Sequence, residues 1–197
     1  LFINTSGIGL ARENVRINPN RAAEGDQIIL SGTIGDHGMA IMSVREGLEF
    51  ETEIVSDTAP LHGMVESMLR ACRDIHVLRD PTRGGVASAL NEIAATAGVG
   101  IEIDEASIPV REEVKAACEI LGLDPLYVAN EGKLLAFVPP ESADRVLAVM
   151  RSHPLGRDAV VIGRVVPDRR GFVSMKTRVG GARIVDMLSG EQLPRIC

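Results

Sequence analysis

Residues 26–44, DQIILSGTIGDHGMAIMSV, join a short apolar run to a glycine-rich turn and then to a second apolar stretch. The run Asp26–Leu30 predicts a strand, because a short apolar run bounded by turn residues is typical of a buried strand. The segment Gly32–Gly38 predicts a loop, and the apolar residues that follow predict a helix through Val44. This strand–loop–helix unit indicates a fold in which helices pack on a sheet.

The same order of elements returns further along the chain. Ile75–Leu78 predicts a buried strand, Asp80–Gly85 predicts the loop after it, and Val86–Ala97 predicts the next helix. The other predicted helices are Leu61–Cys72, 109–121 with Pro109 as its first residue, and a helix around Val146–Met150. The other predicted strands are Ile101–Asp104, Leu134–Val138, Val160–Val166 and Phe172–Thr177, and the turn Asp168–Gly171 joins the last two. We therefore predict an α/β (α+β) sandwich, a mixed sheet with packed helices.

The composition excludes several classes of protein. The 197 residues are 45% hydrophobic and 24% charged, which is typical of a packed domain and not of a disordered acidic tail. The formal charge is −6, and the aromatic residues are one Tyr and four Phe with no Trp, so we expect no nucleic-acid partner. The longest uninterrupted apolar run, Leu134–Val138, is much shorter than a membrane span, and we expect no membrane association.

The cysteines predict neither a disulfide framework nor a zinc site. Cys72, Cys118 and Cys197 are odd in number and show no CxxC spacing, so we expect a protein of the reducing cytoplasm. Cys72 and Cys118 fall on the apolar faces of predicted helices, where they would act as small core residues.

Two of the predicted loops have polar residues that could bind an anion. Gly32–Gly38 could present backbone amides to a phosphate at a helix N-terminus, or it could be a tight turn that needs glycine for its backbone. In Asp80–Gly85, Arg83 could bind a phosphate or a carboxylate. We expect Asp80 or Thr82 to cap the helix that follows.

A third polar cluster, Asn130–Lys133, precedes the strand that begins at Leu134. Glu131 and Lys133 could form an acid–base pair, or they could lie in a surface turn. We expect no metal site, because the histidines have no metal-ligand partners at helical spacing; they include His62, His76 and His153.

The two ends of the chain differ from the central domain, which we expect to span residues 25–189. The chain begins with Leu1, so we expect residues 1–24 to link to a preceding domain. Residues 190–197 are expected to be a flexible tail, since Pro194 prevents a helix from continuing to the end. The thiol of the last residue, Cys197, is either a frayed end or a swinging nucleophile or carrier.

Five motifs taken in order resemble one family. They are Gly-Asp-His-Gly at 35–38, Asp-Pro-Thr-Arg-Gly-Gly at 80–85, Ala-Asn-Glu-Gly-Lys at 129–133, His-Pro-Leu-Gly at 153–156 and the terminal Pro-Arg-Ile-Cys. Together they resemble the hydrogenase-maturation carbamoyl dehydratase (HypE) family of the PurM-like, or AIR synthase-like, superfamily. The resemblance covers the whole chain but only the C-terminal part of the family's proteins. It implies a PurM-type C-terminal domain and an absent N-terminal ATP-binding domain, so this chain alone would be inactive.

The resemblance implies a role in the maturation of [NiFe]-hydrogenase. Cys197 would receive a carbamoyl group, and ATP with Mg²⁺ would drive dehydration of the S-carboxamide to the S-cyanide that supplies the iron's cyanide ligands. Glu131 matches the family's catalytic glutamate and is the candidate base. The candidate residues on the phosphate side of ATP are Gly35, Asp36, His37, Gly38 and Arg83.

The resemblance also implies partners. They are the carbamoyltransferase HypF, the HypC–HypD complex and, in the full-length protein, a second copy of the same chain. Two other classes of function stay open. One is another PurM-like ATP-dependent enzyme, of the selenophosphate or aminoimidazole-ribonucleotide synthetase type, and the other is a non-catalytic module whose tail only docks on a partner.

Overall fold

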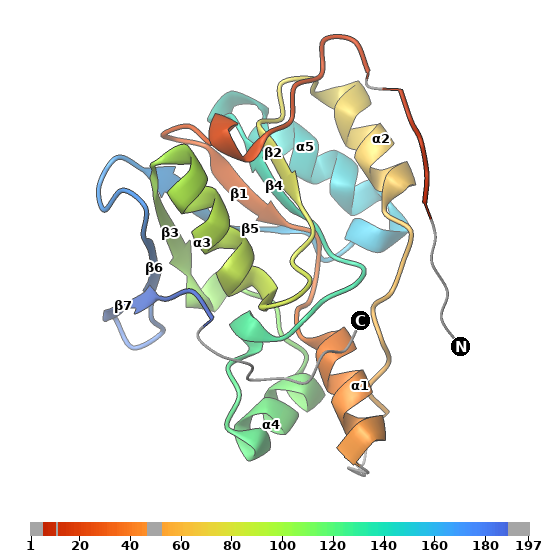
Figure 1. The fold of residues 1–197 in the computed structure, drawn as a ribbon, viewed down its shortest axis with the longest axis vertical. Coiled ribbons are helices and arrows are strands. Elements are labelled where there is room, and N and C mark those ends of the chain that lie inside the picture. The colour runs from red at the N-terminus through yellow and green to blue at the C-terminus, as the bar shows by residue number, and fades with distance from the viewer. Residues whose placement is uncertain (1–5, 11, 47–52, 189–197) are drawn as a thin grey trace.

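The computed structural model describes residues 6–10, 12–46 and 53–188. The strands in these residues are β1 (Gln27–Leu30), β2 (Val77–Arg79), β3 (Gly100–Asp104), β4 (Leu135–Val138), β5 (Val160–Val166), β6 (Val173–Lys176) and β7 (Ala182–Val185). They form one mixed sheet in the order β2-β4-β1-β5-β3-β6-β7 (Figure 1). Neighbouring strands are antiparallel except β3 and β6, which are parallel.

Helices cover the two faces of this sheet (Figure 1). α3 (Gly85–Ala97) packs on one face, and α2 (His62–Ala71) and α5 (Pro140–Ser152) pack on the other. Strand β1 shows the division, because successive side chains of a strand point to opposite faces. Leu30 is buried in the core under α3, whereas Ile29 is buried in the core under α2 and α5. The predicted mixed sheet with packed helices is confirmed.

Two further helices, α1 (Asp36–Glu46) and α4 (Glu112–Leu121), pack together beyond the ends of the strands (Figure 1). Their contact is a small third core, with buried residues Met39, Val114, Ala117, Cys118 and Val128. Short 3-10 helices complete the chain: η1 (Pro19–Arg21), η2 (Glu105–Ser107), η3 (Pro125–Tyr127) and η4 (Pro154–Gly156). The first turn of α1 follows β1 after the short segment 31–35.

The prediction that two cysteines are core residues is confirmed. Cys72 is 4% exposed and Cys118 is 1% exposed. Burial, with a smaller effect from the charges of Asp124 and Glu119, raises the pKa of the Cys118 thiol to about 11. The thiol is therefore neutral at physiological pH, which suits a packing role and not a nucleophilic one.

Some predictions about individual elements were wrong. α4 begins at Glu112 and not at Pro109, because the Pro109 carbonyl accepts a hydrogen bond from the Ile34 amide (3.0 Å) and so lies outside the helix. The predicted turn Asp168–Gly171 does lie between β5 and β6, although β3 separates these two strands in the sheet. β7 was not predicted at all. Its first three residues are exposed and only Val185 is buried, so its sequence lacks the apolar signal of a core strand.

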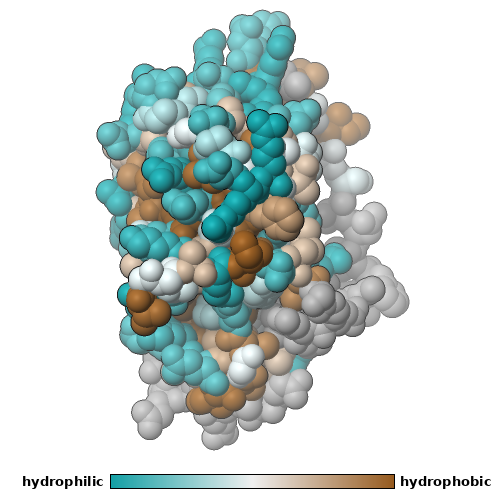
Figure 2. Space-filling view, turned by 90° about the vertical axis from the view of Figure 1, so that its left-hand side faces the viewer, coloured by the Kyte–Doolittle hydropathy of each residue, from teal (hydrophilic) through white to brown (hydrophobic). Residues whose placement is uncertain are grey.

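Strand β7 forms one edge of the sheet. Figure 2 shows the side of the molecule that carries β6 and β7 as a mainly hydrophilic surface with hydrophobic side chains between the polar ones. Ile184 in β7 remains 41% exposed. Scattered apolar residues of this kind are ordinary for a solvent-facing surface.

Candidate functional site

The three polar clusters of the sequence meet at one end of the sheet. Strand β1 leads into Gly32–Gly38, β2 leads into Asp80–Gly85, and Ala129–Lys133 leads into β4. β4 lies between the other two strands and is antiparallel to both, so its first residue, Leu135, pairs with the last residue of each. The ends of β1 and β2 therefore meet the beginning of β4, and the three clusters come together.

Asn130 joins these three segments and is fully buried. Its Oδ1 accepts a hydrogen bond from the Gly35 amide (2.9 Å), and its Nδ2 donates to the carbonyls of Pro81 (2.9 Å) and Val128 (3.0 Å). Its own amide also donates to the Pro81 carbonyl (3.2 Å). A buried side chain with satisfied partners on separate segments fixes their relative positions. Sequence analysis included Asn130 in a motif but assigned it no role.

Two glycines allow the backbones at this site to come close together. A Cβ at Gly38 would lie 2.3 Å from Cγ1 of Val128, and a Cβ at Gly132 would lie 1.7 Å from the carbonyl oxygen of Asp57. Each position therefore excludes a side chain. The amides of Gly35 and Gly38 both donate within the chain, the latter to the Ala129 carbonyl (3.1 Å). An anion at this loop would have to bind other groups of it.

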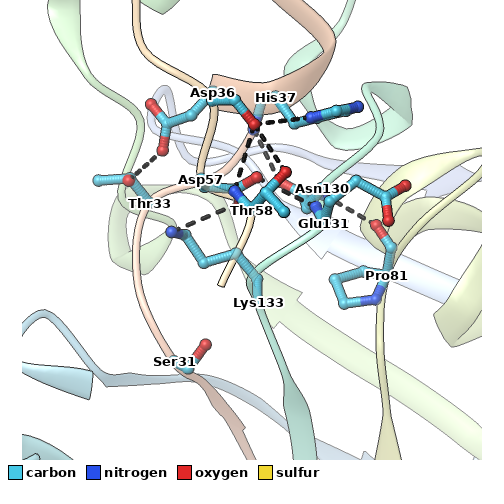
Figure 3. Close-up of polar contacts among 12 residues, drawn as sticks. Ser31, Thr33, Asp36, His37, Asp57, Thr58, Pro81, Asn130, Glu131 and Lys133 are labelled. Atoms are coloured by element: carbon cyan, nitrogen blue, oxygen red, sulfur yellow. Dashed lines mark hydrogen bonds and ion pairs between the residues drawn. The ribbon is translucent and has the colours of Figure 1, made fainter. Parts of the chain in front are cut away.

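Asp57, which sequence analysis did not single out, connects Glu131 with Lys133 (Figure 3). Its Oδ1 accepts a hydrogen bond from the Glu131 amide (3.0 Å), and its Oδ2 lies 3.4 Å from Nζ of Lys133. The side chains of Asp57 and Lys133 are only 3% and 14% exposed. The ammonium group thus offsets the charge of a buried carboxylate. Glu131 and Lys133 therefore form a packed polar cluster with Asp57, and they do not lie in a surface turn.

Asp36 is a second buried carboxylate of the cluster, with a side chain that is 1% exposed. It accepts a hydrogen bond from Oγ1 of Thr33, and its Oδ1 lies 3.4 Å from Nε of Arg111. Burial raises the pKa of Asp36 above its ordinary value of 3.8, although Thr33 and the charges of Arg111 and Lys133 act in the opposite direction. Removal from water disfavours the charged form of a carboxyl group, which explains the direction of this shift.

His37 connects the same loop to the segment that carries Asp57. Its Nδ1 lies 2.8 Å from Oγ of Ser56, which in turn lies 2.8 Å from Oγ1 of Thr58. The carboxylate of Asp57 therefore binds the third cluster, and the hydroxyl of Ser56 contacts His37 of the first. Segment 56–58 is a fourth part of the site, and its sequence carries no motif that could have identified it.

Three carboxylate oxygens of this cluster have no hydrogen-bond partner among the described residues. They are Oδ1 of Asp36, Oδ2 of Asp57 and Oε1 of Glu131. Buried acceptors without a donor are costly, so such a site favours a ligand that supplies a donor. Asp36 and Asp57 each face a cation, whereas no ion pair of Glu131 occurs in the described part of the chain. Glu131 is therefore the carboxylate best suited to take a proton from a bound group.

These carboxylates do not by themselves fit a magnesium site. Mg²⁺ requires several oxygen ligands in octahedral geometry. Over residues 6–10, 12–46 and 53–188, no three His, Cys, Asp or Glu side chains are grouped closely enough to hold a metal ion.

The loop Asp80–Gly85 contributes Pro81 to the buried site and leaves Arg83 exposed. The prediction that Asp80 or Thr82 caps α3 was wrong. The N-cap residue is Gly84, in the left-handed conformation (φ 73°) and without a side-chain cap, and the Gly85 amide donates instead to the Thr82 backbone carbonyl (2.9 Å). Cys197 and the tail 190–197 lie outside the described residues.

The buried carboxyl of Asp36 predicts a pH-dependent stability. Folding raises the pKa of Asp36 above its ordinary value of 3.8. The contribution of this carboxyl group to stability is therefore fully present below pH 3.8, and it is lost as the pH rises through the raised pKa. The side chain of Asp36→Asn cannot ionise. We therefore expect the free energy of unfolding of the variant, compared with that of the parent, to rise from about pH 4 to about pH 7. Urea unfolding at both pH values checks this, with Asp144→Asn, on the exposed side of α5, as the control. A difference from the parent that does not vary with pH would contradict it.

Comparison with known proteins identifies a family for most of the chain. Residues 23–176 match the family model "AIR synthase related protein, C-terminal domain". The chain is 57% identical over 197 residues to the carbamoyl dehydratase HypE of Azotobacter vinelandii. The match covers all of this chain and 58% of the relative, so the chain spans little more than half the length of that protein.

Solved structures agree with this result. A HypE structure in complex with ATP matches with a TM-score of 0.86 and 49% identity, over 91% of this chain and 55% of that one. A HypE–HypF complex matches with a TM-score of 0.85 and 49% identity, over 88% of this chain and 56% of that one. The described helices include none with the length and apolarity that crossing a membrane requires.

Proposed function

The chain belongs to the AIR synthase-related C-terminal domain family, and from this membership we propose that it is the C-terminal part of a HypE-type carbamoyl dehydratase. The observation that carries the proposal is the position of Glu131. It lies next to the buried Asn130 where the three motif loops meet, and it has a buried carboxylate oxygen without a donor among the described residues. The high identity to HypE over the whole chain favours this function over the other PurM-like enzymes.

The proposed reaction converts a thiocarbamate on Cys197 into a thiocyanate. ATP supplies a phosphoryl group to the carbamoyl oxygen, so that this oxygen leaves as phosphate. As the C–O bond breaks, the nitrogen loses its protons and the C≡N bond forms. The overall balance is S-carboxamide plus ATP to S-cyanide, ADP, phosphate and one proton, and the product supplies the cyanide ligands of the [NiFe]-hydrogenase iron.

Glu131 is the proposed base of this step. Its backbone is held by Asp57 through the 3.0 Å hydrogen bond to the Glu131 amide. Its Oε1, which has no donor among the described residues, would take a proton from the carbamoyl nitrogen. Lys133 is paired with Asp57, which keeps its charge close to the reacting group without neutralising Glu131 directly.

The described residues offer one side of an ATP site. Arg83 is exposed and cationic, which suits a phosphate contact. Gly35 and the first turn of α1, with Asp36, His37 and Gly38, lie next to Asn130. They would shape the site more than bind the phosphates, since the amides of Gly35 and Gly38 are used within the chain. Mg²⁺ would be held mainly by the rest of the protein, in the N-terminal domain that residues 1–24 would join to the domain at 25–189.

The proposed partners follow from the similarity of the chain to HypE. Cys197 would be loaded by the carbamoyltransferase HypF, and the cyanide would pass to iron on a HypC–HypD complex in the cytoplasm. A HypE structure in complex with HypF exists for a protein 49% identical to this chain. The whole protein would be a homodimer.

Cys197→Ala in the whole protein separates a carrier from a docking module. We expect the variant to take up no carbamoyl group when it is incubated with the carbamoyltransferase, carbamoyl phosphate and ATP, as measured by intact mass. Cys72→Ala is the control, because Cys72 is buried. If Cys197→Ala is carbamoylated like the parent, the terminal thiol is not the carrier and the proposal fails.

A further inference from the structure

The chain is held by side chains where it leaves strand β7. Nδ2 of Asn91, on α3, donates a hydrogen bond to the carbonyl of Val185 (2.9 Å). The hydroxyl of Tyr127, at the end of η3, donates to the carbonyl of Asp186 (3.0 Å). Burial is the main cause that raises the pKa of Tyr127 above 10, so its hydroxyl is a donor at physiological pH. The carbonyls of the last residue of β7 and of the residue after it are therefore bound by two different segments.

The next contact brings the chain to the candidate site. Leu188 lies against Gly84, where a Cβ added to the glycine would be 3.6 Å from Cδ2 of Leu188. Gly84 belongs to the loop whose Pro81 carbonyl is bound by Asn130. The segment 185–188 thus contacts α3 first at Asn91 and then at Gly84, just before the N-terminus of the helix. It reaches the loop Asp80–Gly85, which Asn130 binds through the Pro81 carbonyl.

Tyr127 belongs to the same arrangement. A Cβ at Gly85 would lie 2.9 Å from the carbonyl carbon of Tyr127, so η3 and the start of α3 are in close contact. The segment after Tyr127 continues through Val128 and Asn130 to Glu131. The residue that binds the Asp186 carbonyl therefore lies on the segment that carries the proposed base.

We propose that residues 185–188, held by Asn91, Tyr127 and Gly84, are an anchor that fixes the point from which the carrier tail starts, and that Tyr127 is a positioning residue for dehydration. The inference rests on the proposed function, because it assumes that Cys197 must reach Glu131. We call residues 185–188 the tail anchor. It would leave residues 189–197 to carry the thiol between the loading enzyme and the site.

The physical reason is the effective concentration of the tethered thiol. Nine residues after Leu188 span at most about 30 Å, and the local concentration of a tethered group falls roughly as the −3/2 power of tether length. Release of the tail anchor would lengthen the tether and move its origin away from the loop beside Glu131. Loading by a separate enzyme needs only an accessible thiol, so it would not depend on this origin.

The first test compares the two half-reactions in the whole protein. We expect Tyr127→Phe, and more strongly Tyr127→Phe combined with Leu188→Gly, to slow single-turnover dehydration of the preloaded S-carboxamide by roughly two- to fivefold, with unchanged loading. Thr177→Val is the matched control. It removes a hydroxyl that binds Gly181 in the turn before β7, outside the tail anchor. Equal dehydration rates in the parent and the double variant would overturn the proposal.

A second measurement does not need the enzyme's activity. With Glu131→Cys as background, a disulfide between positions 131 and 197 in a glutathione buffer reports how often the terminal thiol visits the site. We expect its effective molarity to fall by a similar factor when Tyr127→Phe and Leu188→Gly are added, and not with Thr177→Val. An unchanged effective molarity would contradict the tail anchor even if the parent dehydrates normally. Failure of the parent to dehydrate would contradict the proposed function instead.

Discussion

Glu131→Gln in the whole protein is expected to stop the reaction at the S-carboxamide. The substitution keeps the size of the side chain but removes the basic oxygen. A positioned general base contributes roughly 10²–10⁴-fold to a rate, so dehydration should slow by about that factor. Mass spectrometry of the tail distinguishes the S-carboxamide from the S-cyanide by one water.

Loading of Cys197 in this variant should proceed as in the parent, because it depends on the carbamoyltransferase and not on Glu131. Glu141→Gln is the matched control. It makes the same chemical change on an exposed residue of α5, and it should dehydrate at the parent rate. If Glu131→Gln forms S-cyanide as fast as the parent, then Glu131 is not the base.

Asn130→Ala is expected to have the largest effect on stability. The substitution removes the side-chain partner of the Gly35 amide and of the Val128 carbonyl, and one of the two donors to the Pro81 carbonyl, all around a fully buried position. Each buried group left without a partner costs about 1–3 kcal/mol, so a loss of about 3–5 kcal/mol in the free energy of unfolding is expected.

Urea unfolding of residues 1–197, together with hydrogen exchange at the Gly35 amide, measures this loss. Asn20→Ala is the control, because Asn20 is exposed on η1. The account requires that Gly35 lose protection in Asn130→Ala and keep it in the control. An Asn130→Ala variant as stable as Asn20→Ala would mean that Asn130 does not hold the three loops together.

The fold was predictable where hydrophobic pattern decides the structure. Strands β1, β4 and β5 and helices α2 and α3 lie within a few residues of their predicted ranges, since each buries an apolar face. Strand β7 was missed because an exposed edge strand needs little apolar sequence. The pairing of β3 with β6 depends on contacts between distant segments, which local pattern does not contain.

The candidate site was predictable only in part, because local sequence does not contain contacts between distant segments. Glycine-rich loops after strands indicated where the candidate site lies, but not which side chain joins them. Asn130 makes contacts to Gly35 and Pro81, which are far from it in sequence. Asp57 lies in a segment without a motif, so only the three-dimensional structure relates it to Glu131 and Lys133.

The most direct test of the central claim is the intact mass of the whole protein during one turnover. The protein is first loaded by the carbamoyltransferase with carbamoyl phosphate. The dehydration step is then followed with and without ATP. The account predicts the gain of one carbamoyl group and then, only with ATP, the loss of one water, with both changes located on Cys197. A protein that gains no carbamoyl group, or that keeps it without losing water when ATP is present, would contradict the claim that this chain belongs to a carbamoyl dehydratase.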